Sequence, residues 1–161
     1  MSKFSHLDDR GQARMVDVGG KPETARSARA SCLVTMKPET LTLLESAQLA
    51  KGDAWQVARL AGIAAAKQTS QLIPMCHQLR IDQVGVELSA CPPNQVLIEA
   101  RVSARERTGV EMEALTAAAV AALTLYDMCK AADREMVIGP LQLEEKRGGQ
   151  MGDYCRKDAV T

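Results

Sequence analysis

The sequence predicts an α+β domain, a ferredoxin-like βαββαβ sandwich with an antiparallel sheet and an extra helix in the first crossover. Three observations lead to this prediction. Apolar and polar residues alternate in segments 28–36, 83–90, 95–105 and 137–146, as expected for half-buried strands. Helical patterns separate the first segment from the second and the third from the fourth. No repeat or change in composition divides the chain, so a single domain is expected over residues 1–161.

The two ends of the chain are polar or rich in glycine. Residues 1–27 predict an arm with little regular structure, in which the short apolar patch 15–18 docks onto the rest of the protein. Lys21 and Arg26 make this arm locally basic. Residues 150–161 form a tail. Both the arm and the tail are expected to be mobile.

The first strand, at 28–36, is followed by two helical segments. Pro38 suits the first position of a short helix over 38–47. Asp53 has the character of a helix N-cap and predicts a second helix over 54–72. Pro74 comes directly after that helix and would end it.

The second and third strands form a predicted hairpin. The turn between segments 83–90 and 95–105 is Cys-Pro-Pro-Asn at 91–94, which is typical turn chemistry. The last strand, at 137–146, is expected to be kinked or at an edge because of Gly139 and Pro140. With helices over one face of the sheet, the other face would carry a mixture of apolar and charged side chains, which suits a contact between subunits.

The longest predicted helix covers residues 108–130 and is apolar on all sides. A helix of this kind belongs in the interior of a protein. Charged groups nevertheless stand at both of its ends, with Glu111 and Glu113 at the start and Asp127 and Lys130 at the end. Charges next to a buried helix must be paired, solvated in a cleft, or used in chemistry.

Structural roles can explain each of these charges. Thr108 and Glu111 fit a capping box, and an acid such as Glu113 is favoured by the helix dipole. Asp127 and Lys130 are spaced as an (i, i+3) ion pair. If the charges are instead catalytic, the helix separates Glu113 from Asp127 by about 21 Å, too far for one small-molecule pocket. Such a pocket would have to combine helix ends from two subunits.

Composition excludes several classes of function. Formal net charge is zero, so no global field attracts nucleic acid or an anionic membrane, and a phosphate site must be local. The few aromatic residues cannot build stacking platforms for single-stranded nucleic acid. Five scattered cysteines without a CxxC motif predict neither a disulfide framework nor a zinc module. The amino terminus lacks the apolar core of a signal peptide, so a soluble cytoplasmic protein is expected.

Familiar catalytic motifs are missing, including GxGxxG, the Walker loop, HExxH and GxSxG. A dispersed set of chemically capable residues remains: Lys51, Cys76, His77, Glu111, Glu113, Asp127, Lys130 and Lys146. Adjacent Cys76 and His77 point apart and form a poor metal pair, so no metal site is expected. From the residues alone, an oligomeric enzyme that acts on an anionic substrate stands beside an ordinary set of solvated or paired charges.

Six short strings distinguish this sequence further. They are MVDV (15–18), KGD (51–53), AGI (61–63), LIPMCH (72–77), TGVEMEALT (108–116) and YDMCK (126–130). In this order and spacing the chain closely resembles the molybdenum cofactor biosynthesis protein C family, the cyclic pyranopterin monophosphate synthases. The resemblance runs from residue 15 to about residue 152, and its one departure is Met75, where the family has Leu.

The resemblance implies a ferredoxin-like subunit in a homohexamer, a trimer of dimers, with active sites between subunits. It implies a phosphorus–oxygen lyase that converts a cyclised dihydro-GTP to cyclic pyranopterin monophosphate and releases pyrophosphate. By matching motif, Asp127 would be the catalytic acid/base and Lys130 its neighbour. The substrate would be lined by Met75, Cys76, His77, Met112 and Glu113.

The remaining roles rest on chemistry. Proton transfers during ring opening and closure could use Asp127, Lys130, His77 and Glu113. Cations on loops and on the arm would hold the departing pyrophosphate, and the candidates are Lys51, Lys146, Arg26 and Lys21, with Glu111 beside the substrate. No cofactor is required, although Mg²⁺ can accompany the triphosphate. Two alternatives remain open: a nucleotide-sensing ferredoxin-like module without catalysis, and a structural subunit of a larger complex.

Overall fold

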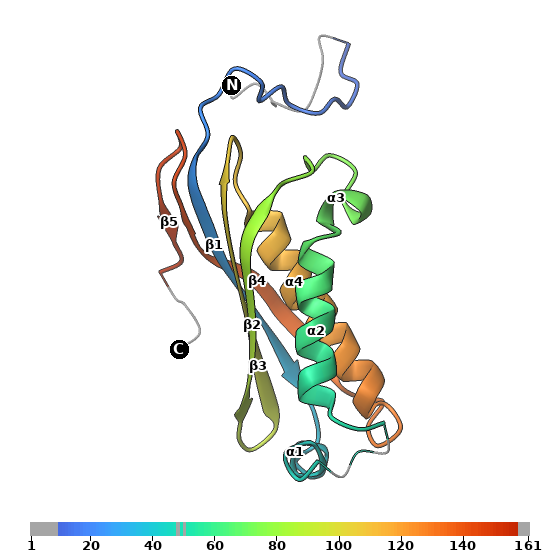
Figure 1. Ribbon diagram of the computed structural model, residues 1–161. Coiled ribbons are helices and arrows are strands. Elements are labelled where there is room, and N and C mark those ends of the chain that lie inside the picture. The colour runs from blue at the N-terminus through green and yellow to red at the C-terminus, as the bar shows by residue number, and fades with distance from the viewer. Residues whose placement is uncertain (1–9, 48, 50, 158–161) are drawn as a thin grey trace.

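The computed structural model describes residues 10–47, 49 and 51–157, and Figure 1 shows its elements. In chain order they are β1 (Thr24–Thr35), α1 (Pro38–Glu45), α2 (Ala54–Ala66), α3 (Thr69–Leu72), β2 (Ile81–Cys91), β3 (Gln95–Glu106), α4 (Glu111–Cys129), β4 (Val137–Arg147) and β5 (Tyr154–Cys155). The four long strands and the helices between them give the predicted ferredoxin-like α+β order, with α1 and α2 both in the first crossover.

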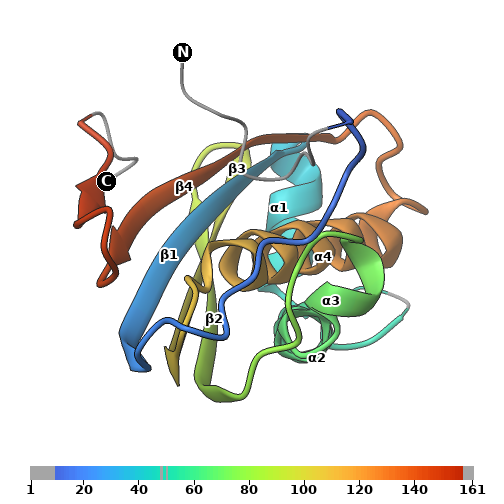
Figure 2. The same ribbon diagram turned by 90° about the horizontal axis from the view of Figure 1, so that it is seen from above.

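One antiparallel sheet contains all five strands in the order β2-β3-β1-β4-β5. The β1–β3 pair is regular from Thr24 opposite Glu106 to Thr35 opposite Gln95. The predicted hairpin joins β2 to β3, with Cys91 opposite Gln95. Figure 2 shows α2 and α4 side by side on one face of the sheet, as predicted from the one-sided apolar alternation.

The core lies between that sheet face and α4. Alternate residues of β1 enter it, and Ala30, Cys32 and Val34 are fully buried. Small side chains on α4 allow α2 to approach closely. A Cβ atom at Gly62 of α2 would lie 2.8 Å from the Ala117 carbonyl oxygen of α4, inside normal contact distance. The two helices therefore depend on a glycine where they meet.

The predicted helix over 54–72 is interrupted. Asp53 does cap it, since its Oδ1 accepts from the Gln56 N–H at 3.1 Å, but α2 ends at Ala66. The hydroxyl of Thr69 donates to backbone carbonyls of the last turn of α2, 3.0 Å from the Ala66 oxygen. Because this hydroxyl competes for carbonyls that would continue the helix, the chain resumes only as the short α3.

Both ends of the chain contain more strand than predicted. β1 begins at Thr24, four residues before the predicted start, because the polar segment 24–27 still pairs with β3. β5 was not predicted; Tyr154 and Cys155 pair with Lys146 and Glu145 of β4. The predicted arm is irregular over residues 10–23, and the remaining tail residues 158–161 lie outside the described part of the chain.

Strand β4 is irregular, as Gly139 and Pro140 predicted. Its register with β1 shifts twice, once between the β1 residues Cys32 and Val34. Among the described residues, β5 pairs only with the end of β4, which leaves the segment 137–144 at the edge of the sheet. The predicted edge position is therefore confirmed for most of this strand.

Helix α4 is the central element of the fold. By length and composition it is the one described helix that could cross a membrane, but more than half of its apolar window is buried inside the protein. Ala114, Ala118 and Leu125 have no exposed surface. These properties belong to a core helix, as the sequence predicted.

Candidate active site at the two ends of one helix

Three predicted residues meet where α4 ends. The Asp127 carboxylate lies between two ammonium groups, with Oδ1 2.6 Å from Lys130 Nζ and Oδ2 2.7 Å from Lys51 Nζ. Lys51 also donates to the Asp127 backbone carbonyl at 2.8 Å. Its loop reaches this position through Gly52, whose φ of 92° favours glycine. The predicted Asp127–Lys130 pair is thus confirmed, and Lys51 completes a cluster.

This cluster fixes the charge of its carboxylate. The hydrogen bond from Lys130, followed by the one from Lys51, lowers the pKa of Asp127 to about 2. The three side chains are about half exposed in the single chain, so the ion pairs and not burial decide this charge. At neutral pH Asp127 is an anion able to accept a proton, flanked by two ammonium groups able to donate one.

A cleft of about 480 Å³ lies at the opposite end of α4. Its lining comprises Val16, Val18, Lys21, Met75, Cys76, His77, Leu79, Thr108, Gly109, Glu111, Met112 and Glu113. The arm contributes one wall, as the apolar patch predicted: Val16 and Val18 are half-buried there, while Met15 stays exposed. His77 Nε2 lies 2.8 Å from the Val16 carbonyl oxygen, so in the tautomer with Nε2 protonated the ring donates to the arm.

Glu113 is the buried acid of this cleft, with a side chain in the first turn of α4 and only 4% of the residue exposed. Burial raises its pKa above the ordinary value, and the neighbouring Glu111 carboxylate raises it further, against a lowering by its own backbone N–H. Burial, with the charge of Glu113, also raises the pKa of the Cys76 thiol. Glu113 therefore holds a proton more readily than an exposed glutamate does.

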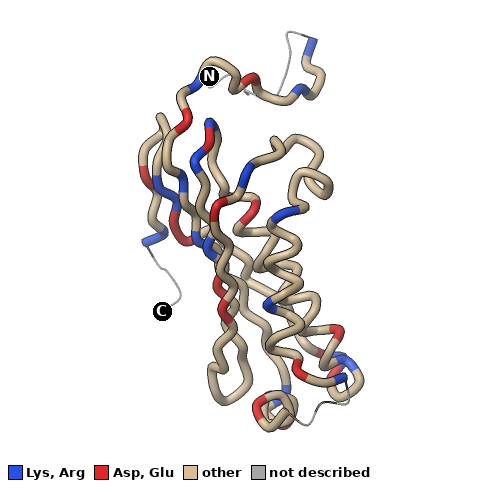
Figure 3. The backbone as a smooth tube through the Cα atoms, viewed as in Figure 1, with Lys and Arg blue, Asp and Glu red and all other residues tan. Residues whose placement is uncertain are grey.

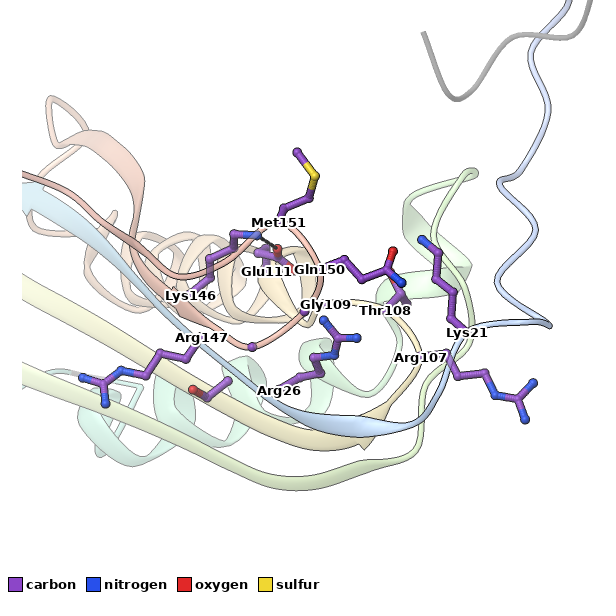
Figure 4. A pocket seen from close by; sticks show the side chains of 13 residues that line it. Lys21, Arg26, Arg107, Thr108, Gly109, Glu111, Lys146, Arg147, Gln150 and Met151 are labelled. Carbon is purple, nitrogen blue, oxygen red and sulfur yellow. Dashed lines mark ion pairs between the residues drawn. The ribbon is translucent and has the colours of Figure 1, made fainter. Parts of the chain in front are cut away.

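Beside the cleft lies a second hollow of about 240 Å³, shown in Figure 4 and here called the anion pocket. Its cationic lining residues are Lys21, Arg26, Arg107, Lys146 and Arg147. The loop 148–151 covers part of it. Four residues line both hollows, namely Lys21, Thr108, Gly109 and Glu111. The two hollows are therefore continuous enough for one ligand to occupy both, with an anionic group in the pocket and the rest of the molecule in the cleft.

Of the described residues that line the anion pocket, Glu111 is the single carboxylate. Its Oε1 lies 3.8 Å from Lys146 Nζ (Figure 4, dashed line). Its side chain turns back over Gly109, in space that a Cβ atom at that position would occupy. The predicted capping box is wrong: α4 begins at Glu111, its N-cap is Val110, and no side chain caps it. The carboxylate faces the pocket lysine instead of the helix backbone.

The predicted residues therefore form two groups within one chain. The first group lies around the start of α4 and comprises Met75, Cys76, His77, Glu111, Met112 and Glu113, with Lys146 and Arg26 beside them. Lys51, which was predicted as one candidate to hold pyrophosphate, lies with Asp127 and Lys130 at the other end of α4 in the single chain. Glu113 and Asp127 stand near opposite ends of α4, so the helix separates the two groups by about 21 Å.

Some lining residues were not predicted. Arg107 directly follows β3 and precedes Thr108, and Arg147 is the last residue of β4, next to Lys146, so a run of polar residues at a strand end was the available signal. Gln150 and Met151 carry no comparable signal in the sequence. Within the part of the chain that the structure describes, no cluster of three or more His, Cys, Asp or Glu side chains could hold a metal ion.

Comparison with known proteins identifies related chains. The model of the MoaC family matches residues 15–149. A protein of Mycobacterium tuberculosis named cyclic pyranopterin monophosphate synthase 1 is 57% identical over 153 residues, which cover 95% of this chain and 90% of the relative. Proteins named cyclic pyranopterin monophosphate synthase in Thermomicrobium roseum and Pelotomaculum thermopropionicum are 56% and 55% identical; each alignment covers 98% of this chain, and 96% and 93% of the respective relatives.

Proposed function

The chain belongs to the MoaC family, and on that premise we propose that it is a cyclic pyranopterin monophosphate synthase of molybdenum cofactor biosynthesis. Its substrate is a cyclised dihydro-GTP, and its products are cyclic pyranopterin monophosphate and pyrophosphate, a phosphorus–oxygen lyase reaction. The observation that carries the proposal is the Asp127 carboxylate held between Lys51 and Lys130, an acid/base cluster on the family's matching residues.

The two hollows at the start of α4 suit the two parts of this substrate. The cleft offers Met75, Met112 and the buried Glu113 to a ring system. The anion pocket offers Arg26 and Lys146 to the triphosphate. Fixed cations around a leaving pyrophosphate stabilise the charge that develops as the cyclic phosphate closes.

The proton transfers are assigned to side chains that have a shifted pKa or that form an ion pair in the site. Asp127 is ionised at neutral pH and accepts a proton, while Lys130 and Lys51 can each donate one. Glu113, whose pKa is raised by burial, is suited to hold a proton beside the ring. Each positioned acid or base of this kind contributes on the order of 10²–10⁴-fold to a rate.

A complete site on this proposal combines two subunits. The start of α4 from one chain supplies the cleft and the anion pocket, and the end of α4 from another supplies Asp127 with its lysines. A symmetric hexamer, a trimer of dimers, would repeat this contact. We place the enzyme in the cytoplasm, with no resident cofactor. Mg²⁺ would enter with the triphosphate, whose oxygens it prefers as ligands.

The test is turnover by the purified protein. Wild type given the cyclised dihydro-GTP should release pyrophosphate and form the cyclic pyranopterin product, and Lys130→Ala should form none. Lys67→Ala is the control, because this exposed lysine lines neither the cleft nor the anion pocket. Binding without product in an assembled wild-type oligomer would replace the synthase with a nucleotide-sensing module. A strict monomer would contradict the shared site.

A further inference from the structure

One buried acid has no part in the proposed reaction. Glu144 of β4 has no exposed surface. Its Oε1 accepts from the Ser31 hydroxyl at 2.5 Å and from Gln142 Nε2 at 3.0 Å. Its Oε2 is also buried and accepts no hydrogen bond from the described residues. A buried carboxylate with one unsatisfied oxygen is costly unless a cation compensates it, so its partner is informative.

That partner comes from the end of the chain. Arg156 Nε lies 3.9 Å from Glu144 Oε2 and donates to the Leu143 carbonyl at 3.0 Å. The Arg156 backbone N–H donates to the Glu144 carbonyl at 2.8 Å. Arg156 directly follows β5, and we call residues 154–156 the C-terminal strap. One arginine thus joins this strap to two consecutive residues of β4.

The strap closes the loop that covers the anion pocket. Between β4 and β5, the Gly148 N–H donates to Asp153 Oδ1 at 2.9 Å, and the Gly152 N–H donates to the Gly149 carbonyl at 3.2 Å. Gly148 and Gly149 have φ of 85° and 94°. A Cβ atom at Gly149 would overlap the Arg26 guanidinium, so the loop lies directly on that side chain.

The same strands place the pocket cations. Lys146 is opposite Tyr154 in the β4–β5 pair, so the strap lies beside the lysine that faces Glu111. If the strap separated from β4, the loop would lose one of its two fixed ends. Arg26 would then lose the wall formed by Gly149, and the pocket would lose the part of its lining contributed by Gln150 and Met151.

We propose that Glu144 and Arg156 are positioning residues: the ion pair between the buried Glu144 and the partly exposed Arg156 holds the C-terminal strap on β4, which keeps the loop 148–151 closed over Arg26 and Lys146 for binding a phosphate chain. The reading of the pocket as the triphosphate site rests on the proposed function, whereas the strap contacts do not. Neither residue touches the reacting atoms. Their effect falls on binding, because an open loop must be ordered before the anion is held.

Calorimetry with inorganic tripolyphosphate tests the inference directly. Arg156→Ala should weaken binding on the order of tenfold, because the closed pocket becomes a minor population. Arg156→Lys, which keeps a cation near Glu144, should recover part of this loss. Glu144→Gln should weaken binding in the same direction, since it removes the charge that attracts Arg156. Cys155→Ser is the matched control in the strap, because the exposed thiol hydrogen-bonds to the neighbouring Arg156 carbonyl oxygen and a serine hydroxyl can make the same bond.

Two further measurements separate positioning from a general loss of stability. Amide hydrogen exchange in Arg156→Ala should accelerate in residues 148–156 and stay unchanged in α4. With the cyclised dihydro-GTP, the KM should rise on the order of tenfold while kcat stays within about twofold. Equal tripolyphosphate affinity in wild type and in a folded Arg156→Ala, or acceleration of exchange throughout the chain, would overturn the proposal. A wild type that binds tripolyphosphate but makes no product would instead count against the synthase, and the strap effect would still be measurable.

Discussion

Lys51 Nζ lies 2.7 Å from Asp127 Oδ2 although 76 residues separate the two along the chain. The contact joins the loop before α2 to the last turn of α4, and Lys130 holds the other carboxylate oxygen. The sequence predicts the Asp127–Lys130 pair and gives Lys51 as a candidate for holding pyrophosphate. Because Lys51 also contacts the acid, its removal should affect Asp127 as well.

Lys51→Met should raise the pKa of Asp127 from about 2, because the carboxylate loses one of the two hydrogen bonds that favour its anion. If Asp127 must be ionised to accept a proton, the acid side of the kcat/KM profile should move to higher pH. A pH–rate profile of the synthase reaction checks this. Lys51→Arg retains the charge and is the control. An unshifted acid limb in Lys51→Met would show that Asp127 does not act as a base.

Glu113→Gln should change how stability depends on pH. The pKa of Glu113 is higher in the folded protein than in the unfolded chain. Its contribution to the free energy of unfolding is therefore fully present below the unfolded pKa and is lost as the pH rises through the folded pKa. At neutral pH and above, the variant should therefore have a higher Tm than wild type, and the difference should shrink in acid. Thermal unfolding between pH 4 and pH 8 measures this, with exposed Glu87→Gln as the control. Equal pH profiles for wild type and Glu113→Gln would contradict the effect of burial.

Glu111→Gln should tighten the binding of inorganic pyrophosphate. Glu111 is the carboxylate of the anion pocket and lies 3.8 Å from Lys146, so removing its charge abolishes a repulsion and frees the lysine. The side chains are partly exposed, and the gain should be modest, about threefold to tenfold at low salt. Titration calorimetry at two salt concentrations checks the effect. Weaker binding in the variant would mean that Glu111 supports the anion, for example through a cation.

Gly62→Ala should destabilise the fold. The added methyl group would lie 2.8 Å from the Ala117 carbonyl oxygen and 3.1 Å from a Val86 methyl, and neither position is an open surface. Overpacking of this kind costs about 1–3 kcal/mol in the free energy of unfolding. Gly85→Ala is the control, because nothing lies within 4 Å of its added Cβ. Urea unfolding measures the stability of both variants. Equal stability of Gly62→Ala and Gly85→Ala would contradict the close approach of α2 to α4.

His77→Ala mixed with Lys130→Ala should regain activity that neither variant has alone. His77 belongs to the group at the start of α4 and Lys130 to the group at its end, so a site shared between chains can take one intact group from each variant. Roughly one quarter of the sites should be intact after random reassembly of equal amounts. The assay is pyrophosphate release after denaturation and joint refolding. No recovery, with normal assembly, would place both groups of a site in the same chain.

Local patterns were sufficient to predict most of the fold. The alternation that marks β1, β2, β3 and β4 and the apolar run of α4 report burial directly, so element types and the sheet face covered by helices were predicted correctly. The break after Ala66 was missed because it depends on a hydroxyl of Thr69 competing with the backbone. β5 was missed because two residues carry no periodicity, and the contacts that Arg156 makes with β4 beside them are long-range.

The candidate site was predicted only in part. Motif spacing identified Cys76, His77 and Glu113, which the fold brings into one cleft. Placing Lys51 required the path of a loop across the end of α4, which no local pattern contains. The turn of Glu111 toward Lys146 depends on a residue of β4 that comes 35 positions later in the chain. Long-range side-chain contacts were therefore the part that sequence could not supply.

The glycine and proline in β4 have a consequence for solubility. The edge of this strand exposes apolar side chains, with Val137 61% and Leu141 44% exposed, and no strand among the described residues pairs with its outer side over 137–142. Such an edge is a template on which strands of other chains can polymerise. Pro140 offers no N–H at the middle of the segment, and Gly139 takes a φ of 134° that extended strands do not have. An incoming strand therefore cannot form a continuous row of backbone hydrogen bonds along this edge, which protects the folded protein against aggregation by strand pairing.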